Sequence, residues 1–477
     1  MGVGAVKTVR RFHALLGMVL ALLAVVTVAV VAVGDQTEPL PVSVQPQDGA
    51  QDVVSTASLV LRFGRPVEQA AVAEHLEIDP PTPGTLEVDR SVVRFTPTGG
   101  FRPGTQYTAT LRRGFPDVTG RALRRDVRLT FATRPPRLLI SQPEPGDQNV
   151  LAPRNLWVTA LDDQPPRPLT REPHGILFAA VAPDGQRVAY TASDPAVPDA
   201  SALWVVNLDG SGRQKAAGDA GGAILSLSWS PRGDIIAYER RSIVGTRGEL
   251  GRPRILGVRP DGGGAGLIYG RGEESGALPV WSPDGLRLLA SDVAAGGRVV
   301  VEPAGTARAA VGLPSGGTDS GTWNADGQQI AIADLEEQRD ATRSVIRVLG
   351  RDGQPDAQLA RAGFSDTAPA WSPDGSTIAV VGLADDGTTG IWLLDPTGAS
   401  PAIPVSLPDE ATGSQFAPPV WSSGGALLAF GRLVEESREE AGQGGALVPV
   451  WELWVAHGDG TGAHRLPVNG LPEGWVP

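Results

Sequence analysis

Residues able to do acid–base, metal or nucleophilic chemistry are few in this 477-residue chain, and they are scattered along it. Cysteine is absent, which removes thiol catalysis, thiolate metal sites and disulfides. The zinc-protease, Walker A and nucleophile-elbow motifs are absent as well. The five histidines show no spacing typical of a metal site: His13, His75, His174, His457 and His464. We therefore expect no catalytic site and no bound cofactor.

Two glycine-rich segments partly match a nucleophile elbow and a phosphate-binding loop, but neither has the spacing or the secondary structure that its motif requires. Gly317–Gly321 (GTDSG) has its serine one position out of register for a nucleophile elbow. Gly262–Gly266 (GGGAG) falls in a predicted hairpin turn and opens no helix, unlike a phosphate-binding loop. A ring of turn aspartates could be imagined to hold calcium, but the spacing of a calcium loop is missing. We expect those aspartates to form turns: Asp184, Asp284, Asp326 and Asp374.

The turn aspartates belong to a five-residue phrase that recurs every 42 to 52 residues, measured between its tryptophans, and Trp475 stands 54 residues after the last of them. WSPDG occurs at Trp281–Gly285 and again at Trp371–Gly375. Looser copies stand at Trp229–Gly233, Trp323–Gly327 and Trp421–Gly425, and a copy without the tryptophan at Ala182–Gly185. Proline presets the second turn position and glycine takes the left-handed position that closes a hairpin. The tryptophan is a large side chain suited to packing between sheets.

Apolar strand-like segments follow each phrase, so each unit is predicted to be a four-stranded antiparallel meander. One such meander cannot bury both faces, whereas several arranged radially can. The repeats resemble the TolB-like β-propeller family from Arg137 to the end of the chain. That resemblance implies a propeller domain over residues 137–477. Propellers of this resemblance sometimes accompany serine peptidases, but we expect no hydrolase domain here.

The two ends of the repeat region are incomplete in complementary ways. Arg137–Ser141, Asn155–Leu161 and Arg167–Thr170 look like the last three strands of a unit that lacks its first. Leu471–Pro477 (LPEGWVP) looks like a first strand without the other three. Pairing them would close the ring with a composite blade, giving seven blades. Six blades is the alternative if the C-terminal segment is a frayed tail.

Residues 40–135 show a different pattern, with short period-2 apolar runs bounded by turn residues. Leu59, Leu61 and Phe63 share one face of a strand, for example. This pattern predicts an antiparallel β-sandwich. The segment resembles the bacterial Ig-like domain of the SbsA type, through these stretches: Gln45–Val53 (QPQDGAQDV), Leu61–Val67 (LRFGRPV), Phe95–Leu111 (FTPTGGFRPGTQYTATL), Asp117–Leu123 (DVTGRAL) and Phe131–Thr133 (FAT). The resemblance implies a spacer or display module without catalytic residues; its exposed sheet edge binding a partner is the alternative.

The N-terminal residues predict membrane attachment. Lys7, Arg10 and Arg11 precede an uncharged run of twenty residues, 14–33, long enough to span a bilayer as a helix. The basic flank favours a cytoplasmic tail at 1–13, a transmembrane signal anchor at 14–33 and a linker at 34–39. A cleaved signal peptide, which would give a secreted protein, is the alternative. In both cases we expect the bulk of the chain to lie outside the cytoplasm.

A candidate binding face follows from the geometry of the meanders. The turns between first and second strands and between third and fourth strands lie on one face, and they are short and uniform. The remaining connections lie on the other face and vary in length: Glu239–Pro253, Asp334–Arg343, Leu383–Gly390 and Glu435–Val448. Insertions confined to one face of a repeat protein mark a binding face, although solvated hairpin tips would look alike. The candidate binding residues there are Arg240, Arg241, Glu336, Asp385, Glu435 and Arg438.

These features together predict an all-β, membrane-anchored extracytoplasmic protein. We expect it to bind or scaffold a protein or cell-wall component and to lack enzymatic activity. The net charge of −12 argues against nucleic acid as a partner. The alternative is an envelope enzyme acting on glycans or peptides, with its site in the propeller channel. A sensor ectodomain is a third hypothesis, weakened by a cytoplasmic tail of only thirteen residues.

Overall fold

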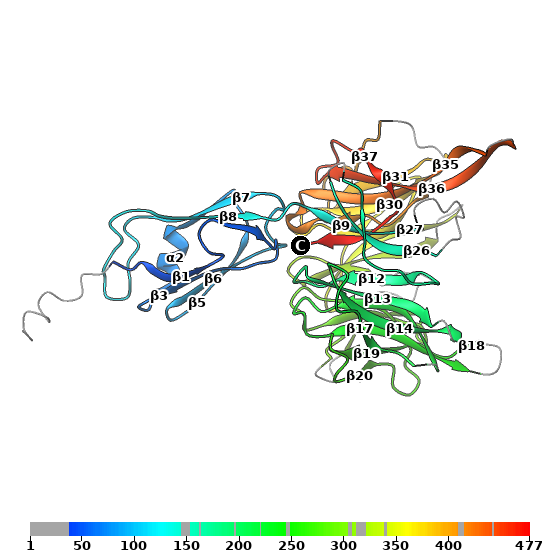
Figure 1. The fold of residues 1–477 in the computed structure, drawn as a ribbon, viewed down its shortest axis with the longest axis horizontal. Coiled ribbons are helices and arrows are strands. Elements are labelled where there is room, and N and C mark those ends of the chain that lie inside the picture. The colour runs from blue at the N-terminus through cyan, green and yellow to red at the C-terminus, as the bar shows by residue number, and fades with distance from the viewer. Residues whose placement is uncertain are drawn as a thin grey trace, which may run out of the picture.

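The computed structural model shows two all-β parts joined end to end (Figure 1). The structure describes residues 38–144, 153–161, 164–194, 197–219, 221–244, 249–303, 308–311, 321–337, 341–408, 415–440 and 443–477. The predicted tail (1–13), the predicted transmembrane segment (14–33) and most of the linker lie outside these residues. Within them, no helix has the length and apolar character needed to cross a membrane.

The first part is a sandwich of two four-stranded sheets. One sheet has the order β1-β3-β6-β5 and the other β2-β8-β7-β4. The strands are β1 (Pro41–Gln45), β2 (Ala50–Val53), β3 (Leu59–Phe63), β4 (Leu76–Asp79), β5 (Gly84–Asp89), β6 (Val92–Pro97), β7 (Gln106–Leu111) and β8 (Val127–Thr133). The apolar positions of the predicted period-2 runs form its core, in which Tyr107 and Phe131 stack and Phe101 packs tilted against Tyr107 and edge-on against Phe131.

Two details of the sandwich differ from the sequence-based prediction. A seven-residue helix, α2 (Gln69–His75), connects β3 and β4 and buries Val72. It is too short to give a clear helical period, so only strands were predicted. The pairing of β2 with β8 is parallel rather than antiparallel. The two strands are far apart in sequence, so no tight hairpin forces them to run antiparallel.

The second part consists of seven antiparallel sheets among the described residues. Six sheets are consecutive in sequence. The first two sheets, each given from its first strand outward, are β12 (Ile176–Val181), β13 (Arg187–Asp194), β14 (Val197–Asn207), β15 (Gln214–Ala217), and β16 (Gly222–Trp229), β17 (Ile236–Val244) with β18 (Glu249–Leu250), β19 (Arg254–Val258), β20 (Gly266–Tyr269). The third and fourth sheets are β21 (Gly276–Trp281), β22 (Leu288–Asp292), β23 (Gly297–Val301), β24 (Arg308–Val311), and β25 (Thr322–Trp323), β26 (Gln329–Glu337), β27 (Thr342–Gly350), β28 (Pro355–Leu359). The fifth and sixth sheets are β29 (Phe364–Trp371), β30 (Ile378–Ala384), β31 (Thr389–Leu394), β32 (Ile403–Pro404), and β33 (Gln415–Phe416) with β34 (Val420–Trp421), β35 (Leu427–Glu440), β36 (Gln443–His457), β37 (His464–Asn469).

The seventh sheet joins the two ends of the repeat region. It has the order β38 (Leu471–Val476), β9 (Arg137–Gln142), β10 (Asn155–Ala160), β11 (Arg167–Pro168). Leu471 lies opposite Ser141 and Val476 opposite Arg137, so the predicted pairing of the terminal segment is confirmed. First strands of successive sheets touch one another, including β38 with both β34 and β12. The first strands therefore surround the centre of a closed ring.

The repeated phrase forms the predicted turns. In the WSPDG copy at 281–285, Gly285 has φ 67° and its N–H donates to the Ser282 carbonyl at 2.8 Å. Asp284 Oδ1 accepts the N–H of Leu286 at 2.9 Å and the Ser282 hydroxyl at 2.6 Å. The aspartate thus stabilises the turn from its side chain, as Asp374 does in the other WSPDG copy.

The sandwich rests on the short-turn face of the ring. The Thr56 hydroxyl donates to the Pro183 carbonyl at 2.7 Å, and the Gly424 N–H donates to the Gly99 carbonyl at 2.7 Å. Gly99 has φ 70°, and a Cβ there would lie 2.3 Å from the Cβ of Pro373. Three turns of the ring therefore support the sandwich, which leaves the long hairpins on the opposite side (Figure 1).

Candidate functional site

The long-hairpin face, defined here by the β17–β18, β26–β27, β30–β31 and β35–β36 connections, lies away from the sandwich (Figure 1). Three of the four connections predicted as loops are largely continued strands. β35 and β36, for instance, stay paired from Leu427–His457 out to Glu440–Gln443. The strands continue into these connections because an antiparallel ribbon satisfies its own backbone hydrogen bonds without a neighbouring sheet. The fourth, between β30 and β31, is a short turn.

Both predicted arginines on β17 form ion pairs. Arg240 Nη2 donates to Asp219 Oδ1 at 2.8 Å and Oδ2 at 3.1 Å. Arg241 Nε donates to Glu239 Oε1 at 2.8 Å. Glu239 is buried, and its other oxygen accepts from Ser226 Oγ and from the Leu278 N–H of the next sheet. Arg240 therefore joins β17 to the segment before β16, and Arg241 supports a carboxylate that bonds to the next sheet.

The other four predicted residues lie on three further sheets. Glu336 accepts a hydrogen bond from Gln358 Nε2 at 3.0 Å, and Asp385 pairs with Arg343, with Nη2 to Oδ2 at 3.0 Å. Glu435 is exposed on β35 opposite Pro449. Arg438 lies on the same ribbon opposite Ala446, and its side chain lies outside the described part of the structure. Among the described side chains, no hydrogen bond or ion pair joins any two of the six residues, so they form no single cluster.

A buried ion pair beneath this face was not predicted from sequence. Arg361 donates to both carboxylate oxygens of Asp366, which is 1% exposed on β29. The guanidinium also lies over the rings of Phe364 and Trp392, 3.9 and 4.3 Å from their centroids. A charged residue in an otherwise apolar strand was the available signal for such a pair.

The first strands of the seven sheets carry two carboxyl groups among the described residues. One is Asp366 on β29, and the other is Glu473 on β38. Burial raises its pKa, against the lowering effects of the Ser141 hydroxyl and of Arg154. β38 is bulged between Pro472 and Gly474, which places Glu473 out of the regular pairing with β9.

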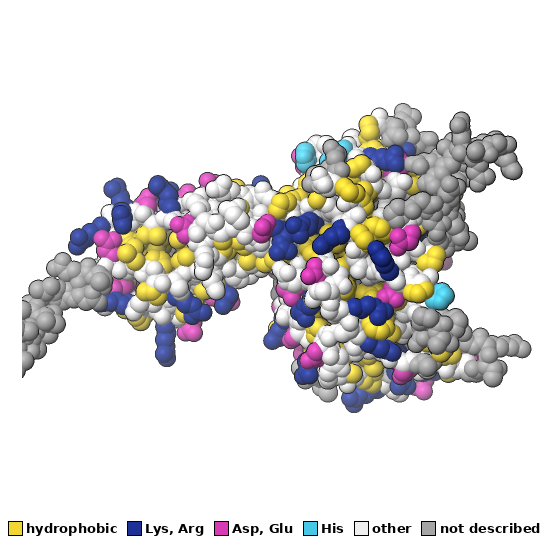
Figure 2. Space-filling model, in the orientation of Figure 1, with side chains coloured by type: hydrophobic (Ala, Val, Ile, Leu, Met, Phe, Trp, Pro, Cys, Tyr) yellow, Lys and Arg dark blue, Asp and Glu magenta, His cyan; other side chains and the backbone are white. Residues whose placement is uncertain are grey.

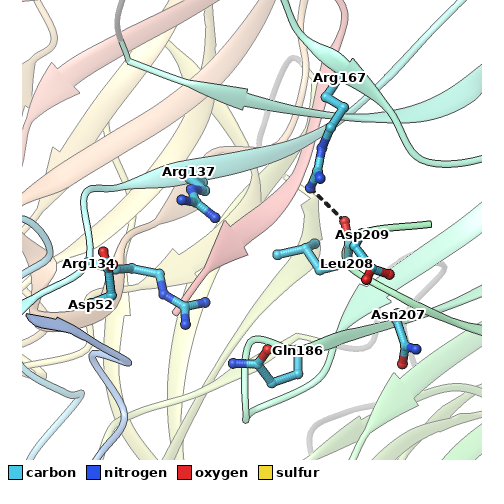
Figure 3. Close-up of a pocket in the computed structure, with 8 residues that line it drawn as sticks. All are labelled: Asp52, Arg134, Arg137, Arg167, Gln186, Asn207, Leu208 and Asp209. Atoms are coloured by element: carbon cyan, nitrogen blue, oxygen red, sulfur yellow. Dashed lines mark hydrogen bonds between the residues drawn. The ribbon is translucent and has the colours of Figure 1, made fainter. Parts of the chain in front are cut away.

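A pocket of about 500 Å³, here called the junction pocket, lies where the sandwich meets the ring. Figure 3 shows eight residues that line it: Asp52, Arg134, Arg137, Arg167, Gln186, Asn207, Leu208 and Asp209. They come from β2, the interdomain linker, β9, β11, the β12–β13 turn and the end of β14. Figure 2 shows dark-blue basic side chains gathered near this junction, on a chain of net charge −12.

The linker holds two of the pocket arginines on either side of Pro135-Pro136. The Arg134 N–H donates to the Val53 carbonyl at 2.9 Å, and the Gly104 N–H donates to the Arg134 carbonyl at 2.7 Å. The prolines add restricted backbone angles. The sequence Arg-Pro-Pro-Arg at a domain boundary was the signal that could have identified this pair.

A second pocket, of about 650 Å³, shares Asp209 with the junction pocket. Inside it the Tyr190 hydroxyl donates to Glu172 Oε1 at 2.6 Å, and Arg213 Nη2 contacts the same oxygen at 2.8 Å. Burial, followed by the Glu172 hydrogen bond, raises the pKa of Tyr190. Arg213 also stacks 3.5 Å from the Trp204 ring centroid. The polar groups of this pocket are largely satisfied by one another.

Metal ligation has no support in the described part of the chain, where no three His, Asp or Glu side chains are grouped as a metal ion would require. The turn aspartates accept backbone N–H groups of their own turns instead.

Residues 35–133 match the family model of a bacterial Ig-like domain. No curated protein sequence matches the chain. The structure is similar to TolB from Acinetobacter baumannii, at 13% identity and a TM-score of 0.41, over 79% of this chain and 80% of that one.

Two further solved propellers are similar. One is the propeller domain of the Trilobed protease from Pyrococcus furiosus (10% identity, TM-score 0.46, 71% of this chain and 98% of that one). The other is the periplasmic gluconolactonase PpgL from Pseudomonas aeruginosa (18% identity, TM-score 0.46, 72% and 99%). At these identities the similarity concerns the fold alone.

Proposed function

We propose that this chain, an Ig-like domain followed by a TolB-like β-propeller, is a membrane-anchored extracytoplasmic scaffold. It binds a protein or a cell-wall component through the long-hairpin face, and it is not an enzyme. The proposal includes the anchor at 14–33, which would put the Ig-like domain between the membrane and the propeller. Nucleic acid is not a partner, because the chain is acidic overall.

One observation carries the proposal: the Ig-like domain is fixed to the short-turn face. The contacts of Thr56 with Pro183 and of Gly424 with Gly99 occupy that face. The opposite face keeps the extended ribbon of β35 and β36, which projects beyond the sheets (Figure 1). Extended ribbons and varied connections on the free face of a repeat protein are where partners bind.

The test is crosslinking and affinity capture from intact membranes with a shortened ribbon. Glu436 pairs with Val448, so replacing 437–447 by Asn-Gly keeps the strand register and makes a two-residue hairpin. The control places the same Asn-Gly turn at Arg90-Ser91, between the paired Asp89 and Val92 of the Ig-like domain.

Loss of crosslinked partners only with the shortened ribbon is the expected result. Equal capture by the wild type and both variants would show that the ribbon binds nothing, and the proposal would fail. Folding of each variant is checked by thermal unfolding, which should give a single propeller transition like that of the wild type.

The alternative of an envelope enzyme has less support. Acid–base cleavage of a glycan uses two carboxyl groups placed on either side of the scissile bond. On the first strands that the structure describes, the two carboxyl groups are Asp366 and Glu473, and Asp366 is held by Arg361.

A further inference from the structure

We propose that the junction pocket binds the phosphate group of a phosphorylated sugar or polyol. This site lies on the short-turn side of the ring, away from the long-hairpin face, so the inference does not depend on the proposed scaffold role.

Three guanidinium groups supply the charge. Arg134 and Arg137 of the linker segment and Arg167 of β11 extend into the same space (Figure 3). Arg134 Nη1 donates to the Gly185 carbonyl at 3.3 Å, and Arg167 Nη2 to the Leu208 carbonyl at 2.8 Å. Arg137 has no hydrogen-bond acceptor or ion-pair partner among the described residues. Since each guanidinium has five N–H donors, most donors in the pocket are available to a ligand.

The mutual repulsion of the arginines favours an anion between them. Burial lowers the pKa of Arg134, and the positive charge of Arg137 lowers it further, while Asp52 acts in the opposite direction. Arg137 therefore lies close enough to Arg134 to disfavour its charge. A bound anion would compensate both charges at once.

The arrangement suits phosphate better than carboxylate. A carboxylate offers two oxygens in one plane and is satisfied by one bidentate arginine. A phosphate monoester offers three terminal oxygens in a tetrahedral arrangement, and here three arginines, two from the linker segment 134–137 and one from β11, surround one space. Preorganisation by the linker prolines and by the two carbonyl contacts reduces the entropy lost on binding.

The remaining lining residues suit hydroxyl groups. Asp52, Gln186, Asn207 and Asp209 offer carboxylate and amide groups, and Leu208 is the one aliphatic side chain among the lining residues that the structure describes. Asp209 is positioned by Ser211, which donates to Oδ1 from its N–H at 2.9 Å and its hydroxyl at 2.6 Å. A nucleobase or acyl chain would need more apolar surface, whereas a sugar or polyol needs such polar partners.

The volume of about 500 Å³ accommodates a small phosphorylated molecule or one unit of a polymer. Both sources carry a phosphate beside hydroxyl-bearing carbons: a small monoester presents three terminal oxygens, and the diester inside a polymer presents two. The ligand would touch the Ig-like domain through Asp52 and the propeller through Arg167 and Asp209, so it would also join the two domains.

The test is isothermal titration calorimetry on the full-length protein in detergent at about 0.15 M salt. The probes are inorganic phosphate, glycerol 3-phosphate, poly(glycerol phosphate) and acetate. The variant Arg137→Gln removes the arginine without a partner. The control Arg124→Gln removes an arginine of the Ig-like domain whose side chain is 74% exposed.

We expect saturable binding of glycerol 3-phosphate that is tighter than that of inorganic phosphate and at least tenfold weaker in Arg137→Gln. The control should bind like the wild type. Tighter binding of the polymer than of the monomer would identify a polymer as the source, and equal binding would identify the free compound.

Absence of saturable binding with all three phosphates, acetate binding as tightly as phosphate, or unchanged binding by Arg137→Gln would each overturn the proposal. Without ligand, Arg137→Gln should unfold at the wild-type temperature or slightly above it, because this side chain makes no described hydrogen bond and its removal relieves the repulsion on Arg134. Addition of glycerol 3-phosphate should then raise the unfolding temperature of the wild type alone.

Discussion

The indole Nε1 of Trp475 donates to the carbonyl oxygen of Val420, 3.0 Å away in the preceding sheet. The same bond recurs at three other tryptophans, each time to the residue before the preceding tryptophan, whereas the Trp371 indole donates to the Gly375 carbonyl of its own turn. Trp281 donates to Ser228, Trp323 to Val280 and Trp421 to Ala370, at 2.9 to 3.2 Å. The repeated tryptophan therefore joins neighbouring sheets by a hydrogen bond as well as by packing.

Replacing Trp475 by phenylalanine should weaken the closure of the ring. Phenylalanine keeps an aromatic side chain but cannot donate the hydrogen bond to the Val420 carbonyl. The loss should lower the free energy of unfolding by about 1 kcal/mol, and further because the carbonyl is left unpaired. Urea unfolding followed by tryptophan fluorescence measures the change. Trp229→Phe is the control, because the Trp229 indole N–H has no partner among the described residues. Equal destabilisation by both variants would contradict a role for the indole bond.

Gly99→Ala should detach the Ig-like domain from the propeller. Its φ of 70° and the closeness of Pro373 leave no space for a Cβ, so the interdomain contact must open. Small-angle scattering should show a larger radius of gyration, and the 134–137 linker should become more sensitive to protease. Gly120→Ala is the matched control, with φ 79° and open space around the new Cβ. A compact Gly99→Ala variant would show that the contact is not needed.

Glu473→Gln should change how stability depends on pH. The folded state raises the pKa of Glu473, so the unfolded chain releases this proton at lower pH than the folded one. Stability is therefore lost as pH rises from the ordinary glutamate pKa through the raised value. Glutamine cannot ionise, so the variant should be more stable than the wild type near neutral pH. The difference in urea midpoint should vanish below pH 4, and a constant difference would exclude this mechanism.

Asp366→Ala should destabilise the propeller by roughly 3 kcal/mol, because it leaves the partly buried Arg361 without its partner. Asp385→Ala breaks the pair with Arg343, in which Asp385 is 59% exposed, and should cost less than about 1 kcal/mol. Urea unfolding of both variants measures the contrast. Similar losses of unfolding free energy in the two variants would mean that burial does not determine how much these ion pairs stabilise the propeller.

The strands and turns were largely predictable because their causes are local. Proline and glycine fix the turn in WSPDG, and alternation from Leu59 to Phe63 fixes which side chains face the core. The complementary incomplete ends also predicted that Leu471–Pro477 pairs beside Arg137–Ser141, since a missing strand can be counted from a repeat. The ion pairs of the predicted binding residues could not be read from the sequence, because their partners lie in other segments, such as Asp219 of the β15–β16 connection for Arg240.

The sequence by itself therefore determined the Ig-like domain, the repeated sheets and the acidic character of the chain. The tertiary structure alone decided that the indoles bond across sheets and that the short-turn face carries the Ig-like domain. It also brought Asp52, Arg137 and Asp209 around one pocket. Backbone preferences and strand periods act over a few residues, so sequence reports them directly. Contacts between distant segments depend on how whole sheets and domains pack, and no local pattern encodes which carbonyl or guanidinium will be their neighbour.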